Sequence, residues 1–330
     1  PLKLRENRKD GSVVVDGAVD AVVKDSPDCE FVSTPGNGCA ARRGHRTKVI
    51  RLIRTFSAAA VLLLFAGPAL ADTIRIGGTT SVRDSGLLRA LQTAFSADTG
   101  HHMQFIVGGT GRVLKLLEAQ DVSGALVHDK LSELDLVARG GAAERLEVMR
   151  NDYLILGPAS AAVPMEALAL LNQISRDQRS FVSRGDNSGT HKAELRLWQG
   201  AGVDVDAKAA RKWYRKSGTG QGATLNIAAS LDAFVLADGA TWLAFDNKAN
   251  LMPKGCFGAA LNNVYGVLIG YDGDAVDARG ALFAEWLTGP GQRVIAAFKI
   301  GDMAPFAPLA DMHTDGPMPT AEAFCEPQQS

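Results

Sequence analysis

The hydrophobic pattern from residue 73 onward alternates between strand-like and helix-like segments. Residues 73–78 (TIRIGG) and 103–109 (MQFIVGG) are short apolar runs that predict strands. Between them, leucine and phenylalanine recur at helical spacing until Gly100, and a second helix is predicted around residues 113–117. This order of strand, helix, strand and helix predicts a parallel sheet, in which ligands bind where strands end and helices begin.

A second α/β set follows a predicted strand at residues 151–157, and the pattern therefore predicts two lobes. We expect the chain to cross near 155–160 and to return near 256–264. The first lobe is then 72–157 plus 262–330, and the second is 158–261. The elements predicted after residue 157 are a strand within 180–186, helices at 188–199 and 207–214, a short helix after 218–222, a strand at 263–271, and helices at 276–287 and 291–298.

The segment 45–71 has the three parts of an export signal. A basic stretch precedes an apolar run from Phe56 to Ala66, and Ala69-Leu70-Ala71 provides a cleavage site. The apolar run is shorter than the roughly 20 residues that span a bilayer. We therefore expect a periplasmic protein that begins near Asp72, and we interpret residues 1–44 as an over-extended N-terminus.

Composition narrows the class further. A content of 46% hydrophobic and 22% charged residues is typical of a globular protein. From residue 72 onward acidic residues exceed basic ones by 5, so the chain lacks the excess of positive charge that is typical of nucleic-acid-binding proteins. Outside the leader only Cys256 and Cys325 remain, and the sequence leaves open whether they form a disulfide. Two distant cysteines do not have the spacing of zinc ligands.

Four loops share one chemistry. Residues 77–86, 108–115, 183–191 and 217–226 each place glycine and hydroxyl residues ahead of a predicted helix. A helix N-terminus offers unpaired N–H groups and a positive dipole end, which together bind anions. Helix capping alone can explain any one of these loops. Their recurrence in one exported α/β chain favours an anion pocket.

Catalytic motifs fit less well. Ser188 is not in a G-x-S-x-G nucleophile elbow, residues 218–222 lack G-x-G-x-x-G phasing, and residues 108–115 lack the Gly-Lys-Ser/Thr of a P-loop. The histidines, including His128 and His191, are scattered without metal-ligand spacing. We therefore expect no enzyme, cofactor or metal site, with an exported enzyme for an anionic substrate as a minor alternative.

Seven segments carry a resemblance to a known family. TTSVRDSGLL, VGGTGRVLKLLE, LVH, MRNDYLILGP, FVSRGDNSGTHKAELRLW, WYRKSGTGQGATLNIA and NVYGVLI follow the order and spacing of the periplasmic tungstate-binding proteins of ABC transporters. The resemblance covers nearly all of residues 73–300. It implies an α/β, two-lobed type II periplasmic-binding-protein fold with two crossover hinges, which closes on tungstate or molybdate as a monomer and delivers the ion to a membrane permease.

The resemblance also implies a set of oxyanion-binding residues. Arg184 is the expected cationic ligand, because a guanidinium can hold two oxygens of one anion. A fully deprotonated MO₄²⁻ ion only accepts hydrogen bonds, so backbone N–H groups and hydroxyls suit it. From the resemblance the expected ligands are Thr79, Thr80, Ser81, Arg184, Ser188, Gly189 and Thr190. The other two glycine-containing loops add Gly109, Thr110, Gly111, Gly222, Ala223 and Thr224.

The choice of ion stays open at this point. Hydrogen phosphate carries a proton and needs one acceptor, which Asp186 could provide unless it pairs with Arg184 or a backbone N–H. Sulfate also fits a pocket of donors. Gly78 stands where the family usually has a further threonine. A sensor that signals to a membrane partner is a further alternative.

Overall fold

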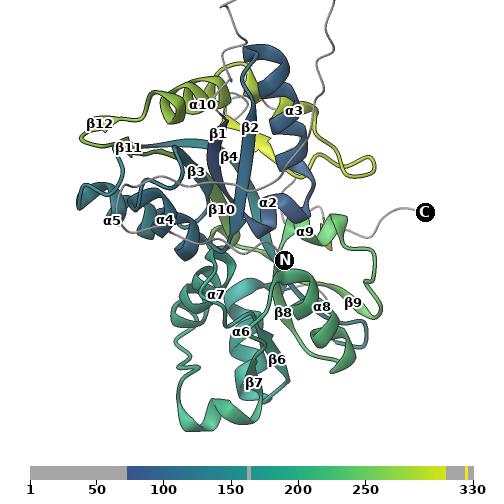
Figure 1. The fold of residues 1–330 in the computed structure, drawn as a ribbon. Helices are drawn as coiled ribbons and strands as arrows, with labels where there is room; N and C mark the ends of the chain where they lie inside the picture. Colours follow the sequence, from purple (N-terminus) through teal and green to yellow (C-terminus); the bar gives the residue numbers. More distant parts are fainter. Residues whose placement is uncertain (1–72, 162–164, 310–323, 326–330) are drawn as a thin grey trace, which may run out of the picture. The chain divides into compact units, whose positions relative to one another are not determined.

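The computed structural model describes residues 73–161, 165–309 and 324–325 (Figure 1). The chain divides into a unit of residues 1–67 and a unit of residues 68–330, and the described residues belong to the second. The N-terminal extension and export signal predicted at residues 1–44 and 45–71 lie outside the described residues. Within the described ranges, no helix combines the length and the apolar character that are needed to cross a bilayer.

The first lobe is built on a mixed sheet with the strand order β2-β1-β3-β10-β4. Strands β1, β2 and β3 are parallel, as the sequence predicts, but β10 runs antiparallel to both β3 and β4. The prediction of a parallel sheet is therefore only partly right, because β10 is the returning strand and enters from the other lobe. The strands are β1 (Ile74–Thr79), β2 (Met103–Gly108), β3 (Gly124–Val127), β4 (Glu144–Pro158), β10 (Asn262–Ile269) and β13 (Ala307–Pro308), which pairs with β4.

Helices cover both faces of this sheet (Figure 1). Consecutive residues of β10 point to opposite faces: Val267 packs in the core under α3, α10 and α11, and Leu268 packs in the core under α4 and α5. The helix predicted to end at Gly100 is α3, and Gly100 adopts the left-handed φ of 73° that ends it. The helices are α2 (Thr80–Asp84), α3 (Leu87–Thr99), α4 (Thr110–Glu118), α5 (Lys130–Ala138), α10 (Ala278–Thr288) and α11 (Gly291–Ala297).

The second lobe contains a short sheet and its own hydrophobic core. The C-terminal part of β4 pairs with β8 and β9, β5 pairs with β9, and β6 pairs in parallel with β7. The elements are β5 (Met165–Glu166), α6 (Ala167–Arg176), β6 (Phe181–Ser183), α7 (Gly189–Gly200), η1 (Lys208–Lys212), β7 (Tyr214–Lys216), α8 (Gln221–Ser230), β8 (Val235–Asp238), α9 (Gly239–Ala244), β9 (Leu251–Phe257) and η2 (Ala259–Leu261). After β10, outside this lobe, β11 (Tyr271–Asp272) and β12 (Ala275–Val276) form a separate hairpin.

The prediction of a helix at residues 207–214 is only partly right. The chain forms the 3-10 helix η1 and then the strand β7, which pairs with β6. Tyr214 stacks on Phe181 with ring centroids 5.9 Å apart, and Trp213 lies 5.4 Å from Trp198. Burial of these two large rings against the core outweighs the high helix propensity of the preceding alanine, lysine and arginine residues.

Strand β4 belongs to both lobes. Its residue Asp152 pairs with Asn262 of β10, and the next residue, Tyr153, pairs with Asp238 of β8. The chain returns between β9 and β10. The lobe boundaries stated above remain a proposal; the second core contains buried residues from Tyr153 to Leu261, and Phe324 and Cys325 also pack against it.

Cys256 and Cys325 form a disulfide, with their Cα atoms 6.1 Å apart. This answers the question that the sequence leaves open. The bond joins β9 to a residue 69 positions further along the chain, so it closes a long loop and restricts the unfolded chain.

We expect loss of this disulfide to lower the free energy of unfolding by about 2–4 kcal/mol. The measurement is urea unfolding of the wild type and of a variant with both Cys256→Ser and Cys325→Ser. Wild-type protein in excess reductant serves as the control and should match the double variant. Equal stability of the oxidised wild type and the variant would contradict this prediction.

Candidate functional site

The N-termini of α4 and α7 meet between the lobes. A Cβ atom built on Gly109, which precedes α4, would lie 3.9 Å from the Cα of Ser188, which precedes α7. A Cβ built on Gly111 would lie 3.5 Å from the Nδ2 of Asn187. The positive ends of two helices therefore lie next to each other, which favours an anion beside them.

Three buried donors near these helix ends have no hydrogen-bond partner among the described residues. They are the hydroxyls of Thr79 and Thr110 and the Nε–H of Arg184. Thr79 ends β1 in register with Gly108, so it lies beside the start of α4. Buried polar groups are almost always paired, and donors left without a protein partner indicate a place for an acceptor ligand.

Arg184 is fixed in the loop between β6 and α7, where it is only 1% exposed. Its Nη2 donates to the Oδ2 of Asp186 at 2.6 Å, and its Nη1 lies 3.4 Å from the hydroxyl of Thr190. The other oxygen of Asp186 accepts from the hydroxyl of Ser188 at 2.6 Å and from its N–H at 3.2 Å. Of the two orientations that the sequence leaves open for Asp186, the structure has the one that pairs with Arg184.

These bonds hold Asp186 ionised. Burial alone would raise the pKa of this carboxyl, but the charge of Arg184 and the hydrogen bonds from Ser188 and Arg184 outweigh burial and lower the pKa. The pair is therefore neutral as a whole, and both oxygens of Asp186 already accept hydrogen bonds from within the loop.

Glu194 is hydrogen-bonded to the start of this loop. It lies on α7, is 2% exposed, and accepts a hydrogen bond from the hydroxyl of Tyr214 at 2.6 Å. Ser183 and the backbone N–H of Arg184 also donate to it. Burial raises the pKa of Glu194 to about 7, against the lowering effect of these hydrogen bonds.

The other predicted ligands are arranged in two groups. Ser81, Gly189 and Thr190 are buried, Ser81 near His128, Gly189 near Thr110 and Thr190 near Arg184. Thr80, half-buried, begins α2. A second group, Gly222 and Ala223, lines a cavity of about 340 Å³ with residues of α2 and α9, among them Arg83 and Thr241. The hydroxyl of Thr224 is used within its own helix turn, where it donates to the carbonyl of Gly220 at 3.0 Å.

His128 is a site residue that the sequence analysis set aside as a scattered histidine. It follows β3 and is 3% exposed, and its Nε2 lies 3.4 Å from the hydroxyl of Ser81. A Cβ built on Gly189 would lie 3.1 Å from the same nitrogen and 2.9 Å from the hydroxyl of Thr110. In the sequence His128 ends the LVH segment, directly after a predicted buried strand. Nothing in that local pattern shows that it lies beside the glycine-rich loops in space.

Ion pairs also join the lobes beside the site. Asp129, which follows His128, contacts Lys192 at 3.1 Å and Arg196 at 2.9 Å, both on α7. Burial would raise the pKa of Asp129, but hydrogen bonds from Ser132 and Lys192 and the two cationic charges lower it. These three side chains therefore carry one net positive charge beside the site.

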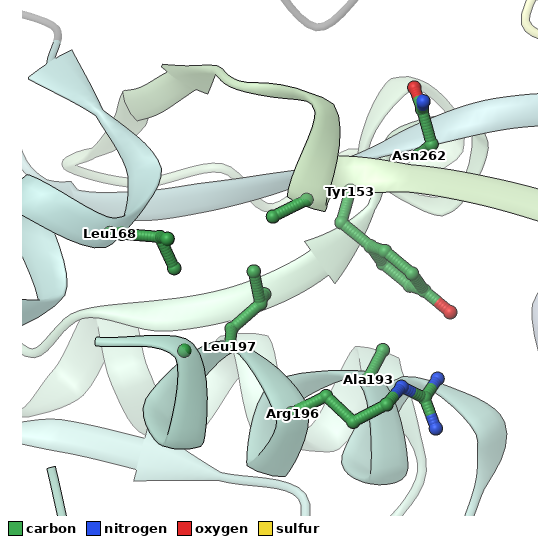
Figure 2. Close-up of a pocket in the computed structure, with 8 residues that line it drawn as sticks. Tyr153, Leu168, Ala193, Arg196, Leu197 and Asn262 are labelled. Atoms are coloured by element: carbon green, nitrogen blue, oxygen red, sulfur yellow. The ribbon is translucent and has the colours of Figure 1, made fainter. Parts of the chain in front are cut away.

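A separate cavity of about 260 Å³ lies where β4 passes between the sheets. Figure 2 shows that the Tyr153 ring and the Arg196 side chain reach to the same side of it, away from Leu168. Apolar side chains such as Leu197 form much of its wall, and Arg196 is already paired with Asp129. Because none of the predicted oxyanion ligands lines it, this cavity is a poor match for an anion.

Among the described residues, no group of three or more His, Cys, Asp or Glu side chains is placed to hold a metal ion. The donors at the junction of α4 and α7 are hydroxyls, backbone N–H groups and a guanidinium. This arrangement can bind an acceptor such as an oxyanion.

Comparisons with known proteins agree with this geometry. A family model described as a PBP superfamily domain matches residues 65–274. The tungstate-binding protein TupA of Peptoclostridium acidaminophilum is 35% identical over 65% of this chain and 77% of its own length. The chain belongs to the tungstate-binding protein family of the PBP superfamily.

Solved structures support the same assignment. The tungstate-binding protein TupA from Desulfovibrio alaskensis G20 is 33% identical, with a TM-score of 0.62 over 72% of this chain and 98% of that one. The tungstate ABC transporter protein from Geobacter sulfurreducens is also 33% identical, with a TM-score of 0.60 over 69% of this chain and 99% of that one. These relatives confirm the two-lobed fold expected from the resemblance, and they are binding proteins.

The raised pKa of Glu194 predicts a specific pH dependence of stability. The folded protein keeps the proton to about pH 7, whereas the unfolded chain loses it near 4.5. Neutral Glu194 therefore stabilises the fold fully below pH 4.5, and this contribution falls as pH rises through 7. At 1.36 kcal/mol per pKa unit, the upper limit of the loss is about 3 kcal/mol.

Urea unfolding between pH 4.5 and 8 tests this on the wild type and Glu194→Gln. The amide cannot ionise, so the stability difference between the two proteins should shift in favour of the variant as pH rises. Glu285→Gln, at an exposed position of α10, is the matched control and should follow the wild type. Parallel curves for the wild type and Glu194→Gln would show that Glu194 titrates normally.

Proposed function

We propose that this protein captures tungstate, with molybdate as the nearest competitor, in the space where the N-termini of α4 and α7 meet. It acts in the periplasm as a monomer, delivers the oxyanion to the permease of an ABC transporter, and catalyses no reaction. The two relatives named TupA are tungstate-binding proteins, and the Geobacter sulfurreducens relative is named as a tungstate ABC transporter.

The observation that carries the proposal is the set of unpartnered buried donors between two helix N-termini. Thr79, Thr110 and Arg184 each keep a buried polar atom without a protein partner, and they come from three separate loops. A tetrahedral dianion accepts from several directions at once, which suits donors that converge from different elements. The remaining predicted ligands, including Thr80, Gly222 and Ala223, are proposed to line the approach to this space.

The orientation of Asp186 favours a fully deprotonated ion over hydrogen phosphate. A protonated phosphate oxygen needs an acceptor, and both oxygens of Asp186 already accept from Arg184 and Ser188. Tungstate, molybdate and sulfate need no such acceptor. Ion size then distinguishes among these three.

Titration of residues 72–330 with tungstate, molybdate, sulfate, chromate and phosphate should give the tightest binding for tungstate. Arg184→Ala should weaken tungstate binding at least about tenfold, since a charged hydrogen bond contributes about 1.5–3 kcal/mol. Arg215→Ala, at an exposed position of β7, is the matched control and should bind like the wild type. Tightest binding of phosphate, or unchanged affinity in Arg184→Ala, would refute this assignment.

Closure of the lobes gives an independent test at Gly189. A Cβ here would lie 2.9 Å from the Thr110 hydroxyl and 3.0 Å from the Cε1 of His128, both across the lobe boundary. Overpacking of this kind costs about 1–3 kcal/mol. Gly189→Ala should therefore weaken tungstate binding roughly tenfold.

The control for this variant is Gly200→Ala at the other end of α7. There the added Cβ would meet Leu168 at 3.5 Å, an ordinary contact distance. Calorimetric titration of both variants measures the effect. Wild-type affinity in Gly189→Ala would mean that the lobes do not need to approach this closely around the ion.

A further inference from the structure

His128 connects the proposed oxyanion site to a buried polar network in the strands that cross between the lobes. Its Nδ1 lies 3.0 Å from the Oδ1 of Asn263 and 2.9 Å from the hydroxyl of Tyr153. Its ring stacks on Tyr265 with centroids 4.8 Å apart. The opposite nitrogen, Nε2, is on the side of Ser81 and Gly189.

The network determines which ring nitrogen carries the hydrogen. The Nδ2 of Asn263 donates to the carboxylate of Asp238 at 2.8 Å and to the Oδ1 of Asn151 at 2.7 Å. A carboxylate only accepts, so the amide nitrogen must face Asp238 and the amide oxygen must face His128. Nδ1 of His128 therefore donates to Asn263, and Nε2 is the nitrogen that is free to gain or lose a proton.

The two protonation states of Nε2 have opposite effects on an oxyanion. Neutral His128 presents a lone pair to the site, and a lone pair repels an ion that can only accept. Protonated His128 presents an N–H and a positive charge. Arg184 is paired with Asp186, and Lys192 and Arg196 both direct their charges at Asp129, so none of these cations is aimed at the ion from the side of His128.

A countercharge for protonated His128 is already present behind it. Asp238 is fully buried and accepts from Asn263, from Asn151 at 3.1 Å and from the Tyr265 hydroxyl at 2.5 Å. The N–H of Thr241 also donates to it at 3.1 Å. All of these donors are neutral, and no salt bridge to Asp238 occurs among the described residues, so its negative charge is stabilised but not cancelled.

We propose that His128 is a further oxyanion ligand that binds as an imidazolium, so that each oxyanion bound takes up one proton from solvent. The proposal rests on the proposed function and adds a requirement to it. Ser81 and Thr110 donate from beside His128, and the protonated ring adds one positive charge on the same side of the ion.

The groups that face His128 define its titration before ligand binds. Burial lowers its pKa, as does the charge of Arg184, while Asp238, the hydrogen bond to Asn263 and Asp129 raise it; the net direction is downward. The tyrosines in contact, Tyr153 and Tyr265, have raised pKa values through burial and stay neutral. A bound dianion must raise the pKa of His128, which is the thermodynamic equivalent of proton uptake.

This linkage has a sign that can be measured. Between the pKa of the free protein and that of the complex, affinity falls as pH rises, by up to about tenfold per pH unit for one proton. Calorimetric titration with tungstate at fixed pH values from 7 to 9, in buffers of different ionisation enthalpy, gives the number of protons taken up. We expect up to one proton per tungstate in the wild type, with sulfate giving the same sign.

Three variants test which residue takes up the proton. His128→Gln retains a neutral amide donor but cannot ionise; it should abolish proton uptake, flatten the pH dependence and weaken binding at pH 7 about tenfold or more. His191→Gln and Glu194→Gln are the matched controls, because His191 is buried in the first turn of α7 with a pKa lowered by burial, and Glu194 has a pKa of about 7. Both controls should retain the uptake.

The outcomes separate this inference from the proposed function. Wild-type protein that binds tungstate without proton uptake, or His191→Gln or Glu194→Gln that abolishes the uptake, would overturn the role of His128 and leave tungstate binding intact. Wild-type protein that binds none of the oxyanions would overturn the proposed function itself. Because the proton count is measured on the wild type and the two controls, the result does not depend on the folding of His128→Gln.

Discussion

The proposed site depends on the repulsion between two helix N-termini that lie next to each other and are both partly positive. α4 and α7 belong to different lobes, and each brings roughly half a positive charge to the same buried space. Without an anion these ends repel, and their unpaired N–H groups lose water as the lobes approach. An oxyanion of two negative charges placed between them offsets both penalties, which is the physical basis of the proposed closure of the lobes on the ion.

The acidic residues around the site pair with the cationic side chains near the two helix ends. Asp186 neutralises Arg184, Asp129 pairs with a lysine and an arginine on α7 and offsets one of their two charges, and Glu194 is buried with a pKa near neutrality. Each carboxyl positions a donor without presenting its own oxygens to the ligand. Ion pairs of Asp129 join the two lobes beside the proposed site, where the helix dipoles that face the ion need little reorganisation.

Periodic segments made much of the fold predictable. The spacing of apolar residues identified β1, α3, β2, α4, α7 and β10, because a strand or helix with one buried face repeats its pattern locally. The segment at 207–214 failed because Trp213 and Tyr214 pack against rings that are distant in sequence. The parallel sheet failed at β10 for a related reason, since its direction depends on where the chain returns.

The candidate site was predictable only where its chemistry is local. Glycine and hydroxyl residues at helix starts mark the loops around Thr110 and Arg184 directly in the sequence. His128 could not be recognised in this way, because Asp238 and Asn263, which determine its hydrogen bonding, lie 110 and 135 positions away. Buried networks of this kind exist only after strands from both lobes have come together.

The position of β10 also constrains how the chain folds. This strand lies between β3 and β4 and bonds to both, although it follows them by more than 100 residues. Until residues 262–269 pair, β3 and β4 each have an unpaired edge in the middle of the first sheet. The whole second lobe lies in the sequence between β4 and β10. The first lobe can therefore complete its sheet only late, through contacts of high sequence separation, which makes slow folding and exposed strand edges inherent in this topology.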